Sequence, residues 1–379
     1  MYEVDLTDPE VIRDPFTAYR RAREAAPVVR LNVPGMPMWA LTRHADARTM
    51  LTDPRFAITS SSFMGIPGVP EGYAAYLRTM SEMDGPDHLR LRRLAAPAFT
   101  ARRAQDFRPN IEPIVEKLLT ELPPEPDLLR DFAKPLPMHV ICELVGIPAA
   151  ERPAWVAWGA IVAELDVPRL GEAVPGIIES ARSIVAGRPE TGLLADLVRA
   201  EDRLTDTELV TLVWHVVLAG QTPVNLIANA VAELWTRPEV LSILRVDPSL
   251  LPGAVDELMR WCGPQLLTVP RYATEDVDLF GTTVKANEPV TVAIAAANRD
   301  PRAFPNPDHF DITRGAATQL GFGHGPHFCL GAAHARVQTE VALSALLSRN
   351  LVLAADPAEL RVPDPGTWRL AALPVHLGN

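Results

Sequence analysis

The sequence predicts a mainly α-helical fold with a small β region. Residues 110–200 repeat apolar side chains at helical spacing in successive segments, which indicates a series of amphipathic helices. The longest periodic segment, Thr205–Trp235, carries Glu208 three residues after Thr205, the pattern of a capping box, and stops at Arg237-Pro238. Short runs bounded by turn residues supply the few strands that we expect.

The helices are predicted, in chain order, at 15–25, from His44 to about Asp53, within Asp84–Arg103, and at 111–122, 136–145, 153–165, 171–186, 193–200, 205–235, 253–261 and 330–349. The strands are predicted at 28–31, 38–41, 277–280, 283–284 and 290–294, with a last hairpin between 351–353 and 368–373. Residues 266–269 also alternate like a strand. The 37 prolines agree with many helix ends and turns.

The bulk composition excludes several classes of protein. A net charge of −11 argues against nucleic acid as a partner. Three scattered cysteines are too few for a disulfide framework or a zinc site, which fits a reducing cytoplasm. The first residues lack the basic and apolar regions of a signal peptide. The longest apolar run, Leu209–Gly220, is shorter than the ~18 residues of a membrane span and contains His215, so we expect no membrane partner.

A glycine-broken stretch, GFGHGPHFCLGAAHAR at 321–336, surrounds Cys329. Glycine permits positive φ and close approach of the backbone to a ligand. A helix is expected to begin at the sulfur, and a helix N-terminus favours a thiolate over a thiol. The stretch therefore predicts a loop that holds one anionic sulfur. The alternative is a small buried cysteine in a glycine-rich turn.

Two further features indicate a ligand site. His88 and Arg92 are four residues apart, so on a helix they share one face, which suits an anionic partner; the alternative is a solvated basic face. Residues 57–85 are rich in Ser, Gly and Pro but also carry Phe63, Met64, Ile66, Val69, Tyr73 and Tyr76. A loop with so many apolar side chains either packs on the core or roofs a pocket.

The 321–336 stretch resembles the haem-binding loop of the cytochrome P450 family, whose pattern FGxGxHxCxGxxxAR is met by Phe322, Gly323, Gly325, His327, Cys329, Gly331, Ala335 and Arg336. The resemblance extends back to the string DPRF at 53–56. It implies a P450 fold in one domain of residues 1–379, and haem b as the cofactor. By resemblance, Cys329 is the axial thiolate, which favours O–O cleavage.

Other roles follow from the same resemblance. His88, Arg92, Arg271 and His327 are implied contacts of the haem propionates, within a site that also includes Phe322, Gly323 and Gly331 of the cysteine loop. Glu257 and Arg260 match the ExxR pair of the family, and Arg314 fits as the arginine that completes it in a structural role. The loop before His88 is expected to roof the substrate pocket.

The middle of the Thr205–Trp235 segment departs from the family pattern. P450s usually have A-G-x-(Glu/Asp)-Thr-Thr there, whereas this chain reads AGQTPVN from Ala219 and Gly220 onward, one residue short. Aligned from the left, Thr222 replaces the acid and Pro223 the alcohol; aligned from the right, Gln221 replaces the acid and Thr222 keeps the alcohol. Either way no carboxylate is present, and Thr222 can only relay a proton.

The function implied by the resemblance is that of a soluble bacterial P450 monooxygenase. It would oxidise a hydrophobic small molecule, such as a polyketide, macrolide or steroid-like compound, with O2 and electrons from a separate ferredoxin and ferredoxin reductase. Arg90, Arg93, Arg102 and Arg103 are candidate docking residues for the ferredoxin. Two alternatives remain: a redox-neutral cyclase or isomerase, suggested by the missing acid, and a haem sensor without turnover.

Overall fold

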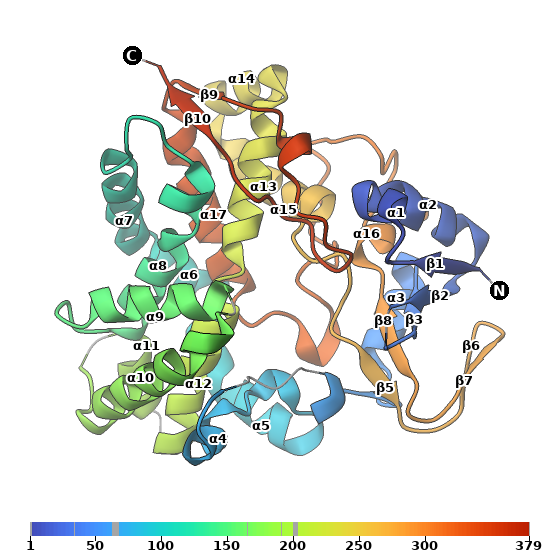
Figure 1. Cartoon of the computed structure of the whole chain (residues 1–379), viewed down its shortest axis with the longest axis horizontal. Helices are drawn as coiled ribbons and strands as arrows, with labels where there is room; N and C mark the ends of the chain where they lie inside the picture. The colour runs from blue at the N-terminus through green and yellow to red at the C-terminus, as the bar shows by residue number, and fades with distance from the viewer. Residues whose placement is uncertain are drawn as a thin grey trace. The chain divides into compact units, whose positions relative to one another are not determined.

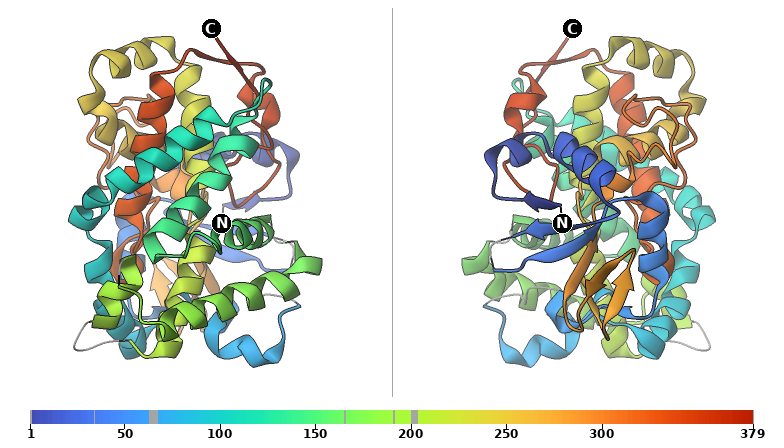
Figure 2. Two further views of the ribbon diagram at one scale, coloured as in Figure 1. Left: turned by 90° about the vertical axis from the view of Figure 1, so that its left-hand side faces the viewer. Right: turned by 90° about the vertical axis from the view of Figure 1, so that its right-hand side faces the viewer.

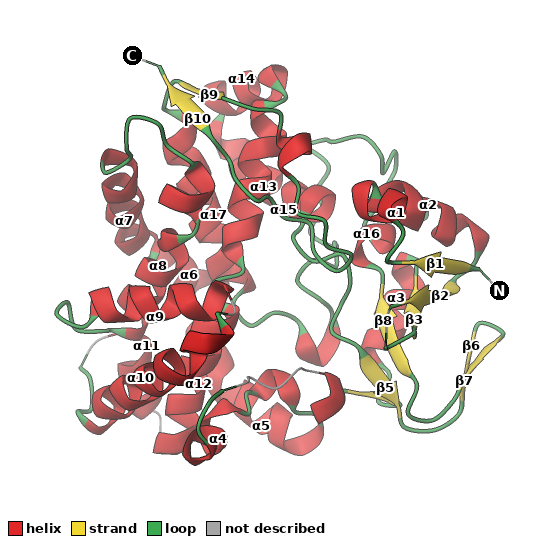
Figure 3. Ribbon diagram, viewed as in Figure 1, coloured by secondary structure: helices red, strands yellow, loops and turns green. Residues whose placement is uncertain are grey.

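The computed structural model describes residues 2–33, 35–62, 68–164, 166–190, 192–199 and 204–378 (Figure 1). The chain divides into two units by its internal contacts. The first unit comprises Met1–Phe63, Ala228–Cys329 and Asp356–Ala371, and the second comprises Met64–Ile227, Leu330–Ala355 and Ala372–Asn379. The fold is that of a helical protein with a small β region, as predicted (Figure 3).

A six-stranded sheet organises the first unit. Its order is β1-β2-β3-β8-β5-β4, with β1 at Glu3–Asp5, β2 at Val28–Asn32, β3 at Met38–Leu41, β8 at Pro289–Val292, β5 at Arg271–Ala273 and β4 at Phe56–Ala57. Strand β3 pairs antiparallel with β2 and parallel with β8, so that Ala40 lies opposite both Val29 and Thr291. Figure 2 shows the blue N-terminal strands beside the orange strands that come from the second half of the chain.

A separate hairpin joins β6 (Val277–Leu279) to β7 (Thr282–Val284). Its two turn residues, Phe280 and Gly281, both have positive φ, at 53° and 83°. Two-residue turns of that kind match the natural twist of paired strands, which explains the tight connection.

Two apolar clusters join the first unit's sheet to α1 (Pro9–Arg13), α2 (Pro15–Ala25), α3 (His44–Thr52) and α16 (Ile294–Ala297). Helices α14 (Pro238–Val246) and α15 (Leu251–Cys262) belong to the same unit. Tyr19 of α2 packs with Leu31 and Ala296 in one cluster, and all three are fully buried. Leu41 and Phe56 pack with Leu320 in the other cluster, directly before the cysteine loop.

The second unit is almost wholly helical. Its helices are α4 (Ala74–Leu77), α5 (Gly85–Ala95), α6 (Ala101–Asp106), α7 (Arg108–Thr120), α8 (Pro135–Val145), α9 (Arg152–Glu164), α10 (Val167–Ala186), α11 (Gly192–Arg199), α12 (Asp206–Ala219) and α17 (Ala332–Leu347), and α13 (Pro223–Trp235) starts there. Trp155 of α9 and Trp214 of α12 are fully buried in its core. The predicted capping box is confirmed, since Thr205 Oγ1 accepts from the Glu208 N–H and Glu208 caps the Thr205 N–H in return.

Most predicted elements are confirmed, and three predictions outside the 205–235 segment are wrong in part. The strand β9 (Leu351–Leu353) pairs with β10 (Val375–Leu377) rather than with residues 368–373. Residues 266–269 form no strand, and Leu267 makes only an isolated bridge to Ala293. Helix α17 begins at Ala332, three residues after Cys329, so the sulfur does not lie in the first turn of that helix.

One helical stretch of the described residues, Asp206–Trp235, has the length and composition of a membrane span. Half of its most apolar 18-residue window is buried inside the protein. A core helix of a globular protein meets the same criterion, so the finding is weak evidence for a membrane.

Candidate functional site

Glu257 and Arg260 of α15 form the buried centre of the first unit's scaffold. Arg260 donates from Nε and Nη2 to the two carboxylate oxygens of Glu257 at 2.6 and 2.7 Å, and both side chains are fully buried. Arg314 adds a third bond, from Nε to Glu257 Oε1 at 3.2 Å. The predicted triad is therefore present, and its members also fix the backbone of the 298–311 segment. Buried charges persist only when paired and hydrogen-bonded in this way.

The cysteine loop follows directly from this scaffold. Asn298 Oδ1 accepts from the backbone N–H of Leu320 at 2.7 Å, and Gly323 and Gly325 then turn the chain with φ of 73° and 72°. The N–H of Cys329 donates to the carbonyl of Phe322 at 2.7 Å, which closes the loop. A side chain at Gly325 would lie 2.8 Å from Thr52 and 3.0 Å from the carbonyl of Leu51, so glycine is required there.

The three cysteines differ in access. Cys329 is exposed, whereas Cys142 and Cys262 are buried. Burial raises the pKa of Cys142 to about 12 and raises the pKa of Cys262 well above its usual value. A thiolate is the form that binds metal. Cys329 is therefore the cysteine of this chain that is suited to ligate an iron.

Arg271 of β5 lies beside the same loop. The residue is 5% exposed, and Nη1 donates to the carbonyl of Leu51 at 2.9 Å. Because Gly325 packs against that carbonyl as well, Arg271 and the cysteine loop meet at the end of α3. His327 lies in the loop itself, in the short 3-10 turn Gly325–His327. The first unit thus holds three of the predicted site residues, Arg271, His327 and Cys329, on the cysteine loop or against it.

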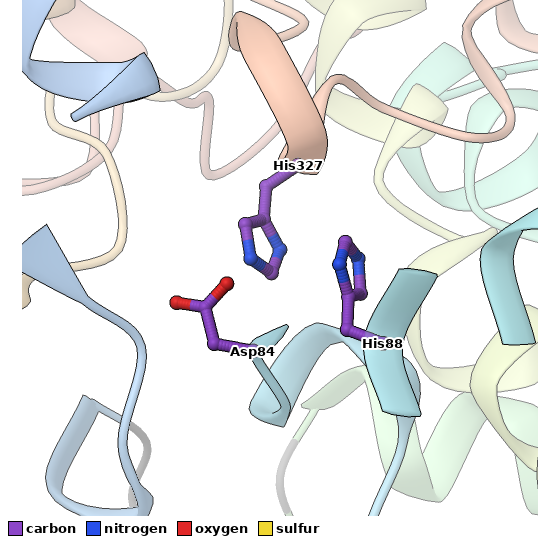
Figure 4. A group of neighbouring side chains, drawn as sticks. All are labelled: Asp84, His88 and His327. Carbon is purple, nitrogen blue, oxygen red and sulfur yellow. The ribbon is translucent and has the colours of Figure 1, made fainter. Parts of the chain in front are cut away.

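His88 and Arg92 lie on α5 in the second unit. His88 is 1% exposed, and Arg92 lies close enough to α12 for its charge to lower the pKa of His215. Asp84, the N-cap of α5, was missed by sequence reasoning. Its carboxylate lies within 4.8 Å of a ring nitrogen of His88, and both side chains are drawn in Figure 4. An Asp directly before a helix is the signal that could have found it.

The predicted central helix is interrupted where its sequence is unusual. Helix α12 ends at Ala219, residues Gly220, Gln221 and Thr222 form a turn, and Pro223 is the first residue of α13. Proline fits the first helical position because no intrahelical bond is expected of its nitrogen there. The cost of about 3 kcal/mol for proline in a helix interior therefore does not arise.

The hydrogen bonds of this turn engage Gln221 and Thr222 differently. Pro223 supplies no N–H for the carbonyl of Ala219, and that carbonyl instead accepts from Thr222 Oγ1 at 3.0 Å and from the Thr222 N–H at 3.3 Å. Thr222 is exposed, whereas Gln221 is buried and donates from Nε2 to the carbonyl of Val217 at 3.0 Å. Thr222 thus holds an exposed hydroxyl, whereas the side chain of Gln221 is buried within the helix end.

A cavity of about 270 Å³ lies between the loop before α5 and the first half of α12. Its walls carry Ala74 and Ala75 of α4, Arg78, Met80 and Met83 of the segment between α4 and α5, Leu91 of α5, Leu204 just before α12, and Thr207, Glu208, Thr211, Leu212 and His215 of α12. The loop therefore lines a cavity, although Phe63, Met64 and Ile66 lie outside the described residues. Sequence reasoning gave His215 no role, yet His215 Nε2 and Ser81 Oγ are hydrogen-bonded at 2.9 Å.

The comparisons with known proteins agree with this geometry. A cytochrome P450 family model matches residues 174–367. The chain belongs to the cytochrome P450 family. The P450 monooxygenase PikC of Streptomyces venezuelae is 38% identical over 96% of this chain and 91% of its own length. Vitamin D(3) 25-hydroxylase of Pseudonocardia autotrophica is 36% identical over 99% of this chain and 96% of its own length.

The solved structures give the same result for the fold of this P450. The ligand-free P450 monooxygenase TamI superposes with a TM-score of 0.90 at 34% identity, over 99% of this chain and 94% of TamI. The protein is a P450 monooxygenase, and its cofactor is haem b. The residues present fit that group, because the first unit offers one accessible cysteine and a buried arginine that meets the cysteine loop at Leu51.

Proposed function

We propose that this P450 is a haem-thiolate monooxygenase in which Cys329 binds the iron. The observation that carries the proposal is the contrast among the cysteines: one is exposed in a loop closed by its own backbone N–H, and two are buried. Haem ligated by a thiolate supplies the chemistry that cleaves O2 and oxidises a C–H bond. The chain's own residues are proposed to position the sulfur, to bind the propionates and to pass a proton.

His88, Arg92, Arg271 and His327 are proposed to bind the propionates. Arg271 is suited to the task because a buried guanidinium forks onto a carboxylate through two parallel bonds. Phe322, Gly323 and Gly331 belong to the loop that would lie against the ring, where glycine lets the backbone approach closely. These roles rest on the match to the family pattern together with the positions described above.

Thr222 is proposed to handle the proton that oxygen chemistry requires. Its hydroxyl hydrogen is directed to the carbonyl of Ala219, so its oxygen remains available to accept a hydrogen bond from water or substrate. Gln221 is an amide without a titratable proton and is engaged with Val217. Ala219 and Gly220 complete the turn that presents Thr222. Bound water or a substrate hydroxyl would then supply the proton that an acid supplies in other P450s.

The role of Cys329 is tested by the carbon-monoxide difference spectrum of the reduced protein. The wild type is expected to give the red-shifted Soret band of thiolate ligation, and Cys329→Ser is expected to lose it. Cys142→Ala is the matched control and should keep the band, since that sulfur is buried. Far-UV circular dichroism checks that each variant is folded. A Cys329→Ser protein with the wild-type band would overturn the proposal.

The substrate is proposed to be a hydrophobic small molecule, such as a secondary metabolite or steroid-like compound. One relative is named for the hydroxylation of vitamin D(3), and the cavity beside α12 is lined largely by apolar side chains. We further infer that residues 1–379 act as one P450 domain, since the relatives match over almost their whole lengths. A cytoplasmic location is inferred from the three scattered cysteines, which form no disulfide framework.

The electron donor is proposed to be a ferredoxin, reduced by a separate ferredoxin reductase, that docks near α5 and α6. Arg90 and Arg103 pair with Glu208 and Asp196, whereas Arg102 is 91% exposed and lies 3.8 Å from Asp106. Such surface pairs contribute roughly 0–1 kcal/mol and can be exchanged for an acidic partner. Arg102→Glu should slow reduction by ferredoxin more at low salt than at high salt. Equal rates at low salt would remove Arg102 from the docking surface.

A redox-neutral reaction is the second candidate, favoured by the absence of a carboxylate at Gln221. Product formation from a candidate substrate without O2 and without reductant would establish it. The variant Gln221→Glu restores the acid beside Val217. If this variant raises the yield of product per NADPH consumed, the missing acid limits ordinary hydroxylation. An unchanged yield would show that water or substrate already fills that role.

A further inference from the structure

Residues 68–83 of the second unit form a strap that contacts both α10 and α12. The strap contains α4 and two short 3-10 turns, Glu71–Tyr73 and Met80–Glu82. Helix α4 packs against α12 (Figure 1), and Met80 is 6% exposed in the apolar core that α10 and α12 share. A helix of four residues is not stable by itself, so the strap depends on its contacts with these two helices for its structure.

The first contact joins one end of the strap to α10. A Cβ added at Gly171 of α10 would lie 2.7 Å from the carbonyl oxygen of Gly68, which is too close for any real side chain. The two backbones can meet in this way because Gly171 has no Cβ. Further along α10, the guanidinium carbon of Arg182 lies 5.9 Å from the centre of the Tyr76 ring, within the range of a cation–π contact.

The second contact joins the other end of the strap to α12. His215 Nε2 and Ser81 Oγ are hydrogen-bonded at 2.9 Å, while Nδ1 of the same ring is buried and has no hydrogen-bond partner in the part of the chain that the structure describes. Burial lowers the pKa of His215 to about 4, so the ring is neutral at pH 7 and carries one proton. That proton belongs on Nε2, where it is donated to Ser81, because on Nδ1 it would be a buried donor without an acceptor.

The strap begins at a glycine, and a second glycine follows it. Gly68 has a φ of 79°, and Gly85, at the start of α5, has a φ of 70°. No atom lies within 4 Å of the place that a Cβ at Gly85 would take, so the backbone there has room to turn. A few residues of this kind at the ends of an element can absorb the change in backbone dihedrals that a movement requires.

The backbone between the two contacts is held by short turns. The N–H groups of Tyr73, Glu82 and Met83 donate to carbonyls within the strap itself. Single turns of this kind are weak, because fixing several dihedrals is offset by only one hydrogen bond. Loss of either contact should therefore release the whole strap. Segments of this kind open locally at a free energy below that of global unfolding.

We propose that the strap opens and closes as one cooperative unit, and that the Ser81–His215 hydrogen bond and the Gly68–Gly171 contact together hold it closed. The strap supplies part of the wall of the cavity beside α12, through Ala74, Ala75, Arg78, Met80 and Met83. Opening of the strap uncovers that cavity. That the molecule admitted in this way is the substrate of the enzyme rests on the proposed function.

The inference is tested by amide hydrogen exchange of the haem-loaded protein, followed by mass spectrometry. Ser81→Ala removes the contact at one end of the strap, and Gly171→Ala disturbs the contact at the other end. Each variant should speed exchange at both ends, in residues 69–73 and in residues 80–83, by about two- to ten-fold, the effect of losing one neutral hydrogen bond or a contact of similar strength. Alanine is a better helix former than glycine, so α10 itself should not exchange faster in Gly171→Ala.

Two controls limit the interpretation. Gly72→Ala is the matched substitution within the strap, and nothing lies within 4 Å of the Cβ that it adds, so it should not speed exchange. The β6–β7 hairpin belongs to the first unit and should exchange at the wild-type rate in every variant.

Three outcomes would overturn the inference. Exchange that rises only at the end next to each substitution would show that the two contacts open separately. Wild-type exchange of the strap in Ser81→Ala, or a Gly171→Ala protein that behaves like Gly72→Ala, would remove that contact as a closing element. Faster exchange of the β6–β7 hairpin as well would indicate general destabilisation and no local opening.

The exchange experiment is independent of the haem chemistry. If it fails in a protein with the normal carbon-monoxide spectrum, the strap is overturned and the haem-thiolate proposal stands. If both ends of the strap respond in a protein without that spectrum, the strap is confirmed and the proposed enzyme chemistry is rejected.

Discussion

Removing the charge of Glu257 is predicted to destabilise the protein severely. The carboxylate accepts four hydrogen bonds: two from Arg260, one from Arg314 and one from the backbone N–H of Asp311. Glu257→Gln keeps the volume of the side chain but leaves two buried guanidinium groups without their anion. Breaking a buried ion pair on one side costs about 3–5 kcal/mol. The free energy of unfolding should therefore fall by at least about 3 kcal/mol.

Glu121→Gln, the same substitution at an exposed ion pair, is the control for Glu257→Gln. Glu121 pairs with Lys117 at 3.9 Å, and both side chains are about two-thirds exposed, at 60% and 66%. The free energy of unfolding of Glu121→Gln should therefore lie within about 1 kcal/mol of the wild-type value. Both variants are compared with the wild type by urea unfolding followed by far-UV circular dichroism at matched haem content. If Glu257→Gln loses no more stability than Glu121→Gln, the view that this triad holds the first unit together is wrong.

Two further predictions concern α17 and the turn before α13. Burial lowers the pKa of His334 from 6.5 to about 4, so the unfolded chain takes up the proton first as the pH falls, and stability present above pH 6.5 is lost towards pH 4. The free energy of unfolding should fall by about 2 kcal/mol between pH 7 and pH 5 through this histidine. His334→Phe keeps a ring against Phe99 and should remove that fall when urea unfolding is measured at both pH values. A fall that is as large in the variant as in the wild type would refute this. Thr222→Val leaves the Ala219 carbonyl without its hydroxyl donor, so the free energy of unfolding should fall by about 1 kcal/mol. The amount of product formed per NADPH consumed should also fall. An unchanged ratio of product to NADPH would exclude Thr222 from proton handling.

The local features of the fold were predictable because each depends on neighbouring residues. The capping box depends only on Thr205 and Glu208, which are three residues apart. The pair Glu257–Arg260 is set by one turn of helix, and Arg314 could be added only through the family resemblance. Pro223 is the local signal of the break in the Thr205–Trp235 segment, because proline cannot donate to the carbonyl of Ala219, which accepts from Thr222 instead.

The features that sequence reasoning missed depend on distant pairing. Ser81 and His215 are 134 residues apart, and nothing in either segment specifies the other. Strand β9 was assigned the wrong partner because residues 368–373 are as apolar as Val375–Leu377. The backbone of the earlier segment is instead occupied elsewhere, with Leu370 bridged to Arg361. Strand pairing of this kind is decided by tertiary context and not by local pattern.

The most direct test of the account is X-ray absorption at the iron edge of the haem-loaded protein. The wild type and Cys142→Ala should both show a sulfur neighbour of the iron, and Cys329→Ser should show none. A sulfur neighbour that persists in Cys329→Ser, or one that is missing from the wild type, would contradict the assignment of Cys329 as the ligand.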